Sequence, residues 1–312
     1  MTATLPLGFV RTADGRLRVP ELFPDPALVD EFWEEGFFRV PLLDDEALIE
    51  LGSRFAALTP GDGFHPKLAD GASCTYHCTF LDRDHSYRRQ ADELVRDVFE
   101  APLRSVIPGY QVLTANIYVK PPGEGRFEIH QNWPTIEALD VPTLTAWVPL
   151  QPTSFANGTI RMVRGSHHVF PDVSAASADK FFAGFERDLI ETYLEPVDVG
   201  AGEALVFDDS LLHWSGANLS SQPRVTFQIE LIPDGVPAVL WTRALDDPQQ
   251  FDLWEIDKEF WIEYPFESVL GAPEGLPHVD RRPNPNRPIT LAEFADAMRR
   301  GPEIRRSLYD LG

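Results

Sequence analysis

The sequence predicts a mainly β protein with flanking helices, built around a sandwich or barrel of short strands. Between residues 110 and 232, short segments rich in β-branched and aromatic residues alternate with turns that contain Pro, Gly, Asn and Ser. Such spacing is typical of sandwiches and barrels. Before residue 110, apolar residues recur at helical spacing instead. We therefore expect one domain (1–312), with a helical layer at 1–109, a β-core at 110–232 and an extension at 233–312.

Helix and turn signals place the elements before residue 110. Asp25 can cap a helix, Pro26 suits its first turn, and Gly36 can end it. Apolar residues at helical spacing predict two further helices, separated by a loop rich in Gly and Pro. The predicted segments are an extended arm at 1–24, helices at 25–36, 45–58 and 86–107, a strand at 37–40 and a loop at 60–73.

Short β-forming segments, interrupted by one helical insert, make up the predicted core. A helix at about 179–192 is expected within the insert at 174–194. An aromatic and acidic stretch at 251–266 is expected to pack against the barrel or to wall a pocket. A loop is predicted at 281–288, and Thr290 is expected to cap a last amphipathic helix. The predicted strands are 111–120, 127–133, 144–150, 159–163, 195–198, 204–208 and 225–232.

The acidic composition narrows the classes of partner. The 312 residues include 27 Lys and Arg against 49 Asp and Glu, a formal net charge of −22, and 43% are hydrophobic. This apolar content supports a folded core. The negative charge argues against nucleic acids and anionic membranes, because both need a basic face. We expect a small-molecule substrate, and both a monomer and a homodimer stay open.

The cysteines and the N-terminal residues predict a cytoplasmic protein. Only Cys74 and Cys78 are present, which excludes a disulfide scaffold and fits two thiols in a reducing compartment. The first residues, MTATLPLGFV, have no basic start and no long apolar core, so we expect no signal peptide. No apolar run approaches the ~18 residues of a membrane helix.

Polar residues in three β-segments form the most informative pattern. His130 and Asn132 alternate in EIHQNW, so a strand would direct both to one face. His213 follows a glycine-led strand, and Arg224 begins an otherwise apolar strand. Two imidazoles and a third ligand on one face are typical of non-haem iron sites, and an Arg can hold a carboxylate in a bidentate fork. No phosphate-binding loop, dinucleotide fingerprint, zincin motif or nucleophile elbow occurs.

The chain resembles the phytanoyl-CoA dioxygenase family of Fe(II)/2-oxoglutarate oxygenases over roughly residues 28–232. The segments EFWEEGFFRVPLL, HQNW, LTAWVPL, NGTIRMVRGSHH and FDDSLLHWSGANLSSQPR carry the resemblance. It implies a double-stranded β-helix core, of the jelly-roll or cupin-like kind, and an enzyme that uses Fe(II), 2-oxoglutarate and O₂. It also implies that His130 and His213 bind iron and that Arg224 binds the distal carboxylate of 2-oxoglutarate.

The resemblance implies further roles around the cosubstrate. Trp147 and Asn116 are expected to line its pocket, and Ser220 is expected to add a hydroxyl near Arg224. The turn Gly165-Ser166-His167 is expected to be structural.

Asn132 departs from the family pattern, which has Asp at this position. Four interpretations stay open. Asn132 binds iron or lies behind the ligands, and the enzyme hydroxylates an unactivated C–H bond of a small-molecule metabolite. Alternatively, chloride fills the ligand position, as in related halogenases. Glu128 could replace the missing carboxylate, or the barrel could be a degenerate, non-catalytic ligand-binding module. Substrate identity is not predicted; His77, residues 64–67 and the insert are candidates for the cavity mouth.

Overall fold

The structure is a computed structural model that describes residues 10–11, 17–18, 23–58, 60–61, 63–66, 74–123, 125–137, 142–170, 174–176 and 178–301. Its α-helices are α1 (Pro26–Glu35), α2 (Asp45–Ala57), α3 (His85–Val106), α4 (Glu186–Thr192), α5 (Phe260–Glu263) and α6 (Leu291–Arg300). Its strands are β1 (Val10–Arg11), β2 (Leu17–Arg18), β3 (Phe37–Pro41), β4 (His77–Cys78), β5 (Tyr110–Lys120), β6 (Phe127–His130), β7 (Leu144–Pro149), β8 (Ile160–Met162), β9 (Glu195–Pro196), β10 (Glu203–Asp208), β11 (His213–Ser215), β12 (Arg224–Pro233), β13 (Ala238–Arg243), β14 (Gln250–Ile256) and β15 (His278–Pro283).

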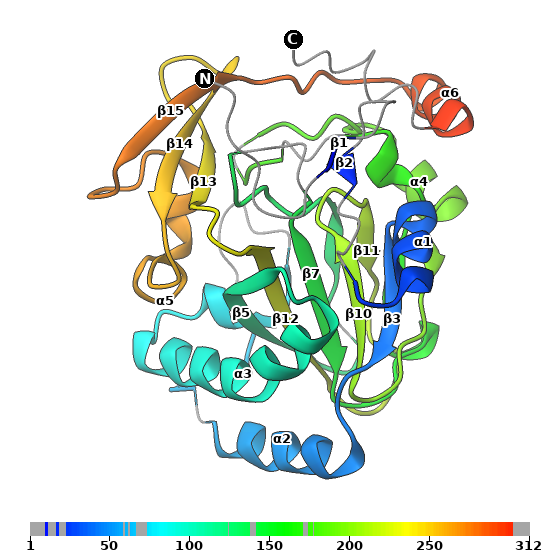
Figure 1. Cartoon of the computed structure of the whole chain (residues 1–312), viewed down its shortest axis with the longest axis vertical. Coiled ribbons are helices and arrows are strands. Elements are labelled where there is room, and N and C mark those ends of the chain that lie inside the picture. The colour runs from blue at the N-terminus through cyan, green and yellow to red at the C-terminus, as the bar shows by residue number, and fades with distance from the viewer. Residues whose placement is uncertain are drawn as a thin grey trace.

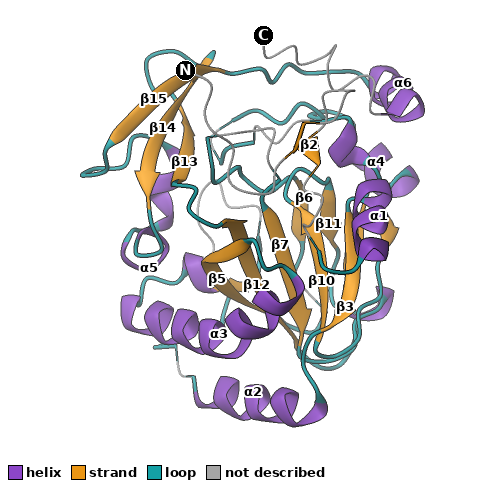
Figure 2. Ribbon diagram, viewed as in Figure 1, coloured by secondary structure: helices purple, strands orange, loops and turns teal. Residues whose placement is uncertain are grey.

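Two antiparallel sheets form the core of the molecule (Figures 1 and 2). The larger sheet has the order β3-β10-β7-β12-β5-β4, and the smaller has the order β6-β11-β8-β9. From β5 to β12 the chain passes back and forth between the sheets, and only β8 and β9 are consecutive strands of one sheet. This alternation is that of a double-stranded β-helix, so the predicted mainly β fold class is confirmed.

The two faces of strand β12 separate the helical layer from the interior of the barrel. Val225, Phe227 and Ile229 pack in an apolar cluster with residues of α1, α2 and α3, and Figure 2 shows α3 crossing the outer side of β5 and β12. Side chains alternate along a strand, so Arg224 and Gln228 face the smaller sheet instead. The polar side chains of β12 therefore line the interior of the barrel.

The predicted helix ends are confirmed in the N-terminal layer. Asp25 caps α1, because its Oδ1 accepts from the Ala27 N–H over 2.9 Å. Gly36 ends α1 at φ 85°, a left-handed conformation that favours glycine. Asp84 caps α3 by accepting two backbone N–H groups. The predicted loop at 60–73 and the arm at 1–24 lie largely outside the described residues.

Two predictions within the core were wrong in extent. The strand predicted at 127–133 ends at His130, because the N–H of Asn132 donates to the Asp209 carbonyl instead of continuing the sheet. The helix predicted at 179–192 is shortened to α4, since Gly184 has φ 101° and interrupts it. His213 opens a strand, β11, that the sequence pattern did not indicate.

The C-terminal extension forms a third sheet, β13-β14-β15, which was not predicted. Arg281 of β15 contacts Asp252 of β14 over 2.7 Å, so the predicted loop at 281–288 begins inside a strand. The stretch after β14 packs on the barrel, where Trp261 joins an aromatic cluster with Phe80 and Tyr118. The assignment of one domain to the whole chain stays a prediction.

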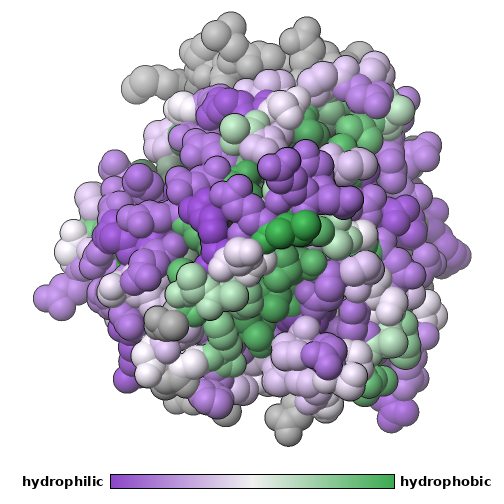
Figure 3. All heavy atoms as spheres, turned by 90° about the horizontal axis from the view of Figure 1, so that it is seen from below, coloured by the Kyte–Doolittle hydropathy of each residue, from purple (hydrophilic) through white to green (hydrophobic). Residues whose placement is uncertain are grey.

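Polar residues cover most of the face seen from below, around an apolar band near its centre (Figure 3). Among the described helices, none is long and apolar enough to cross a membrane.

Candidate metal and cosubstrate site

His130 and His213 lie side by side in the smaller sheet. His130 closes β6 and His213 opens β11, and the antiparallel register pairs the two residues directly. Their ring centroids are 4.1 Å apart. The register therefore brings together two histidines that are far apart in the sequence.

Backbone hydrogen bonds fix the tautomer of both rings. Nδ1 of His130 donates to the Glu128 carbonyl over 2.7 Å, and Nδ1 of His213 donates to the Leu211 carbonyl over 2.8 Å. A carbonyl only accepts, so each Nε2 keeps its lone pair for a metal. Burial lowers the pKa of His213 to about 4 and holds the pKa of His130 well below its ordinary value. Both rings are therefore neutral near pH 7, the form that binds metals.

Asn132 lies just after β6, and its amide is held from one side. Nδ2 donates to Thr145 Oγ1 over 2.8 Å and to Asp209 Oδ1 over 2.9 Å. The Thr145 hydroxyl donates to the same Asp209 oxygen over 2.6 Å. Both amide hydrogens are used in this network, so Oδ1 points away from Asp209. The Asn132 side chain also lies close enough to the His130 ring to act on its pKa.

Asp209 is a site residue that sequence reasoning missed. It is 1% exposed and follows β10. Burial raises the pKa of its carboxyl to about 6, although hydrogen bonds from Thr145, Asn132 and Thr143 act in the opposite direction. Its position in the FDD segment, directly after a strand, was the available signal. Among the described residues, no group of three or more His, Cys, Asp and Glu side chains could hold a metal, in keeping with Asn at position 132.

Two buried basic side chains face each other beside the histidines. Arg224 of β12 pairs in register with Lys120 of β5, and they are 1% and 0% exposed. Lys120 Nζ donates to Ser215 Oγ and to the Gly216 carbonyl, each over 2.5 Å. Arg224 Nη1 donates to the Gly158 carbonyl and, over 3.2 Å, to Ser215 Oγ. Neither side chain forms an ion pair with a described residue, and Arg224 Nε has no hydrogen-bond partner among the described residues.

This arrangement leaves positive charge in the interior without a counter-ion from the described residues. Burial, and secondly the charge of Arg224, lower the pKa of Lys120 to about 5. Burial also lowers the pKa of Arg224. A buried, unpaired charge costs several kcal/mol, so the pair suits a small anionic ligand that would occupy the cavity beside it.

Two of the remaining predicted site residues, Trp147 and Asn116, line cavities beside the histidines. Trp147 lines the cavity that contains both histidines and Arg224, and its ring lies 5.3 Å from the Arg224 guanidinium carbon. Asn116 lines the adjoining cavity, where its Oδ1 accepts from the Phe80 N–H over 3.1 Å. Both residues therefore border the space around the histidines.

Ser220 is not brought to either of these cavities. Its hydroxyl is hydrogen-bonded within the turn before β12, to Asn218 Oδ1 over 2.6 Å and to the Gln222 carbonyl over 3.0 Å. Ser215 supplies a hydroxyl beside Arg224 instead. Sequence reasoning missed Ser215 and Lys120, although pairing the predicted strands 111–120 and 225–232 would have placed Lys120 opposite Arg224.

The turn at Gly165-Ser166-His167 supports the neighbouring strand. Ser166 Oγ accepts from the Leu212 N–H over 2.9 Å, directly before His213, and Gly165 has φ 74°. This contact fits the structural role that was predicted.

A second cavity adjoins the first at His130 and Asn132. It encloses about 850 Å³, part of which is open to solvent. Ser174 and Lys180 of the predicted insert line it. Its polar wall includes Glu230, whose Oε1 lies 3.5 Å from Gln228 Nε2 and whose pKa burial raises to about 8. Its aromatic wall consists of Phe80, Tyr118, Phe127, Trp133, Trp261 and Phe266.

His77, Phe64 and the Glu128 side chain do not line the two cavities at the histidines. His77 is fully buried, and its Nε2 contacts the Tyr87 hydroxyl over 2.8 Å. Phe64 packs against Phe55 in the helical layer, and Lys67 lies outside the described residues. The Glu128 side chain is 52% exposed and pairs with Lys180 over 3.4 Å, so it does not replace the missing carboxylate.

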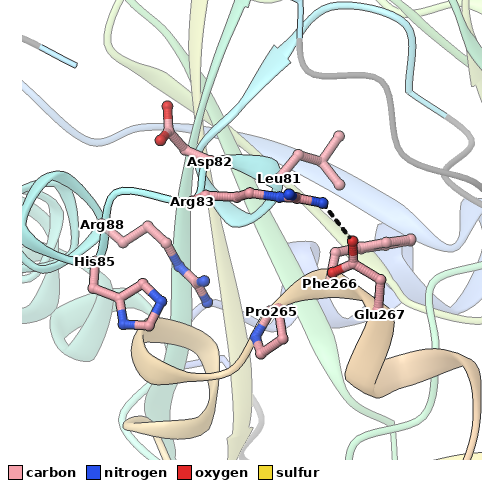
Figure 4. Close-up of a pocket in the computed structure, with 8 residues that line it drawn as sticks. All are labelled: Leu81, Asp82, Arg83, His85, Arg88, Pro265, Phe266 and Glu267. Carbon is pink, nitrogen blue, oxygen red and sulfur yellow. Dashed lines mark hydrogen bonds and ion pairs between the residues drawn. The ribbon is translucent and has the colours of Figure 1, made fainter. Parts of the chain in front are cut away.

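A separate pocket lies beside the start of α3 (Figure 4). Arg83 crosses to Glu267 over 2.9 Å, and Arg88 donates to the Tyr264 carbonyl over 2.8 Å. This pocket shares Leu81 and Phe266 with the 850 Å³ cavity but contains neither histidine of the site. Its charged groups bind the C-terminal extension to α3, which indicates a structural role.

The donor set fits Fe(II) and a dicarboxylate. Two neutral imidazoles with free Nε2 atoms and an amide oxygen are ligands that non-haem iron accepts. Arg224, with its orphaned Nε, and Lys120 fit the far carboxylate of 2-oxoglutarate.

Comparison with known proteins agrees with this donor set. The family model described as phytanoyl-CoA dioxygenase (PhyH) matches residues 62–226, which is more than half of the chain. No sequence among the curated proteins matches the chain.

Solved structures give weaker similarities. The non-heme alpha ketoglutarate dependent epimerase SnoN from nogalamycin biosynthesis is 20% identical, with a TM-score of 0.49 over 69% of this chain and 86% of SnoN. The carbocyclase SnoK from the same biosynthesis is 17% identical, with a TM-score of 0.48 over 69% and 85%. HygX from Streptomyces hygroscopicus, with nickel, 2-oxoglutarate and hygromycin B bound, is 16% identical, with a TM-score of 0.47 over 71% and 91%. The chain covers half of EvdMO1. All these TM-scores are below 0.5, so the assignment depends on the family match and the site itself.

Proposed function

We infer the chemistry of this protein from one premise: the chain belongs to the phytanoyl-CoA dioxygenase family. It is a non-haem iron oxygenase that depends on 2-oxoglutarate and uses Fe(II), 2-oxoglutarate and O₂. When bound, Fe(II) and 2-oxoglutarate activate O₂ to oxidise a C–H bond, and 2-oxoglutarate is converted into succinate and CO₂. The finer proposal is that this protein hydroxylates an unactivated C–H bond of a small-molecule metabolite.

In this proposal, His130 and His213 bind Fe(II) through Nε2, and Asn132 binds through Oδ1. The observation that carries the proposal is the shared orientation of these atoms: both Nδ1 atoms are bonded to carbonyls, and both Asn132 hydrogens are bonded away from the histidines. Three protein ligands on one face leave the other positions for 2-oxoglutarate and O₂.

Arg224 and Lys120 have the complementary task of binding the far carboxylate of 2-oxoglutarate. Their burial keeps water away from the pair, so an arriving carboxylate meets two strong donors in a low dielectric. Trp147 packs beside the guanidinium and limits where the cosubstrate can lie. The barrel therefore orients the cosubstrate before any substrate arrives.

Two alternatives are less well supported. Chloride at the third ligand position would have to displace a side chain that is tethered by two hydrogen bonds to Thr145 and Asp209. A degenerate barrel would have no reason to keep two basic groups, Lys120 and Arg224, buried without an anionic partner, since their desolvation destabilises the fold. Hydroxylation by a functional iron site accounts for both observations.

The 850 Å³ cavity supports a substrate with an apolar or aromatic body and one hydrogen-bond donor, a hydroxyl or a protonated amine. Aromatic side chains form much of its wall, and Glu230 is a half-buried carboxyl that forms no ion pair with a described residue. The cavity meets the proposed metal ligands at His130 and Asn132, so a bound molecule would reach the iron.

The test is O₂-dependent conversion of 2-oxoglutarate into succinate by the protein loaded with Fe(II). Such enzymes turn over slowly without their substrate, so succinate formation is expected for the wild type and a loss to background for His213→Ala. Ser220→Ala is a suitable control, since its hydroxyl lies outside the cavity. Equal succinate formation by wild type and His213→Ala would contradict the proposal.

A further inference from the structure

We propose that Asp209 is the positioning residue of the iron site, where it holds the Asn132 amide with Oδ1 toward the histidines and provides, from behind, the negative charge that a ligand Asp would provide directly. The inference depends on the proposed function, because it concerns how Asn132 serves as a ligand. In effect, the carboxylate lies behind the ligand position, and an amide occupies that position.

The hydrogen-bond network permits one orientation of the amide. Nδ2 lies 2.8 Å from Thr145 Oγ1 and 2.9 Å from Asp209 Oδ1, and the Thr145 hydroxyl donates to that same oxygen. A flipped amide would place its oxygen against the Asp209 carboxylate, so that two acceptors would face each other without a hydrogen. The pairing of donors and acceptors therefore assigns Oδ1 to the side of the histidines.

Asp209 is held as firmly as the amide it positions. Its carbonyl accepts from the Asn132 N–H over 2.9 Å, and its own N–H donates to the Thr143 carbonyl over 3.1 Å. Asp209, Thr145 and Asn132 are 1%, 0% and 8% exposed. They come from three separate segments of the barrel, so the network ties together the strands around the site.

The Asp209 carboxylate also makes the amide oxygen of Asn132 a stronger metal ligand. A charge-assisted hydrogen bond from an amide N–H to a carboxylate is stronger than a neutral one, and it draws electron density toward the amide oxygen. An oxygen with more negative charge is a better ligand for a hard divalent cation than that of an isolated Asn.

The charge balance of the site is restored by the same group. Fe²⁺, a 2-oxoglutarate dianion and a ligand Asp sum to −1, whereas with a neutral Asn they sum to zero. An ionised Asp209 within hydrogen-bond distance of Asn132 returns the sum to −1.

Exchanging Asn132 and Asp209 tests the inference more sharply than removing either group alone, because the exchange keeps one carboxylate and one amide at the site. Asn132→Asp places two carboxylates side by side and should weaken metal binding, although it recreates the family ligand. Adding Asp209→Asn should restore binding, because the pair then has one carboxylate and one amide again. Asp209→Asn alone should lower metal affinity by about tenfold or more, the usual effect of losing a hydrogen-bond partner of a ligand.

The experiment is an anaerobic titration with Co²⁺. Calorimetry measures the affinity, and the visible spectrum of Co²⁺ reports the ligand set independently of activity. Thr145→Val, which removes one partner of the amide, should give a smaller loss and serves if Asp209→Asn fails to fold. Glu128→Gln is the matched control, since it removes a charge two residues from His130 without touching Asn132, and its affinity should equal that of the wild type.

The expected order of affinity places the wild type and the double variant Asn132→Asp/Asp209→Asn above both single variants. If Asn132→Asp alone binds Co²⁺ as tightly as the double variant, or if Asp209→Asn and Thr145→Val match Glu128→Gln, the inference is overturned while the iron site stands. If the wild type binds no Co²⁺, the proposed function fails as well.

Discussion

Lys120 and Arg224 stand opposite each other on adjacent strands, both fully buried and neither ion-paired with a described residue. A buried arginine beside a second desolvated basic group destabilises the fold unless an anion joins them. The closeness of Lys120 and Arg224 therefore indicates an anionic ligand. Substitution of one of them should affect the stability of the fold and the binding of that ligand in opposite directions.

Lys120→Met should raise the melting temperature of the cofactor-free protein and weaken 2-oxoglutarate binding. The substitution removes a buried, desolvated amine next to Arg224 and leaves an apolar chain of similar length. Thermal unfolding with and without 2-oxoglutarate measures both effects. A lower melting temperature together with unchanged 2-oxoglutarate affinity would show that Lys120 is only structural.

Binding of 2-oxoglutarate should take up a proton at neutral pH. In the free protein the pKa of Lys120 is lowered to about 5, so the amine is mostly neutral at pH 7. A bound carboxylate raises that pKa, the complex holds more protons than the free protein, and affinity must fall as pH rises from about 6 to 8. Cys74, Tyr76 and Arg224 also face this amine.

Calorimetry in buffers of different ionisation enthalpy measures this proton uptake directly. Lys120→Met is the control, and it should abolish the uptake. An affinity that is independent of pH in the wild type would rule out this role of the amine.

Ser215→Ala should weaken 2-oxoglutarate binding, by about tenfold, whereas Ser220→Ala should leave it unchanged. The Ser215 hydroxyl contacts both Lys120 and Arg224, but the Ser220 hydroxyl is bonded within its own turn. Fluorescence or calorimetric titration of both variants distinguishes the two serines. The reverse order would support the sequence-based assignment of Ser220.

Glu230→Gln should abolish a preference for amines over acids in the 850 Å³ cavity. We expect phenethylamine to stabilise the wild type against thermal unfolding more than phenylacetate does, because Glu230 has no cationic partner among the described residues. The effect should grow from pH 6 to 8, since the pKa of Glu230 is raised to about 8 and its charged form increases over that range. Equal shifts with both compounds in the wild type would exclude Glu230 as the recognition group.

Much of the fold could be predicted from local signals. Caps such as Asp25 and the glycine at position 36 act within a few residues, and β-forming segments are legible in the core. The third sheet was missed because its strands contain charged residues, such as Arg281 and Asp252, whose pairing becomes visible only once the strands are adjacent.

Site residues that match a sequence motif could be predicted. Site residues that reach the site only through the register of paired strands were missed. His130, His213 and Arg224 were identified from spacing and resemblance, and the structure gathers them around one cavity. Lys120 and Asp209 reach the site through strand pairing and hydrogen bonds between segments distant in sequence. Such contacts become visible only once the predicted strands are placed in register.

The central claim is that His130, His213 and Asn132 hold an iron that binds 2-oxoglutarate. Anaerobic addition of Fe(II) and 2-oxoglutarate should produce a weak visible charge-transfer band in the wild type, which chloride does not alter. The band should be absent in His213→Ala. A wild-type protein with no band, or a band of equal strength in His213→Ala, would contradict the account.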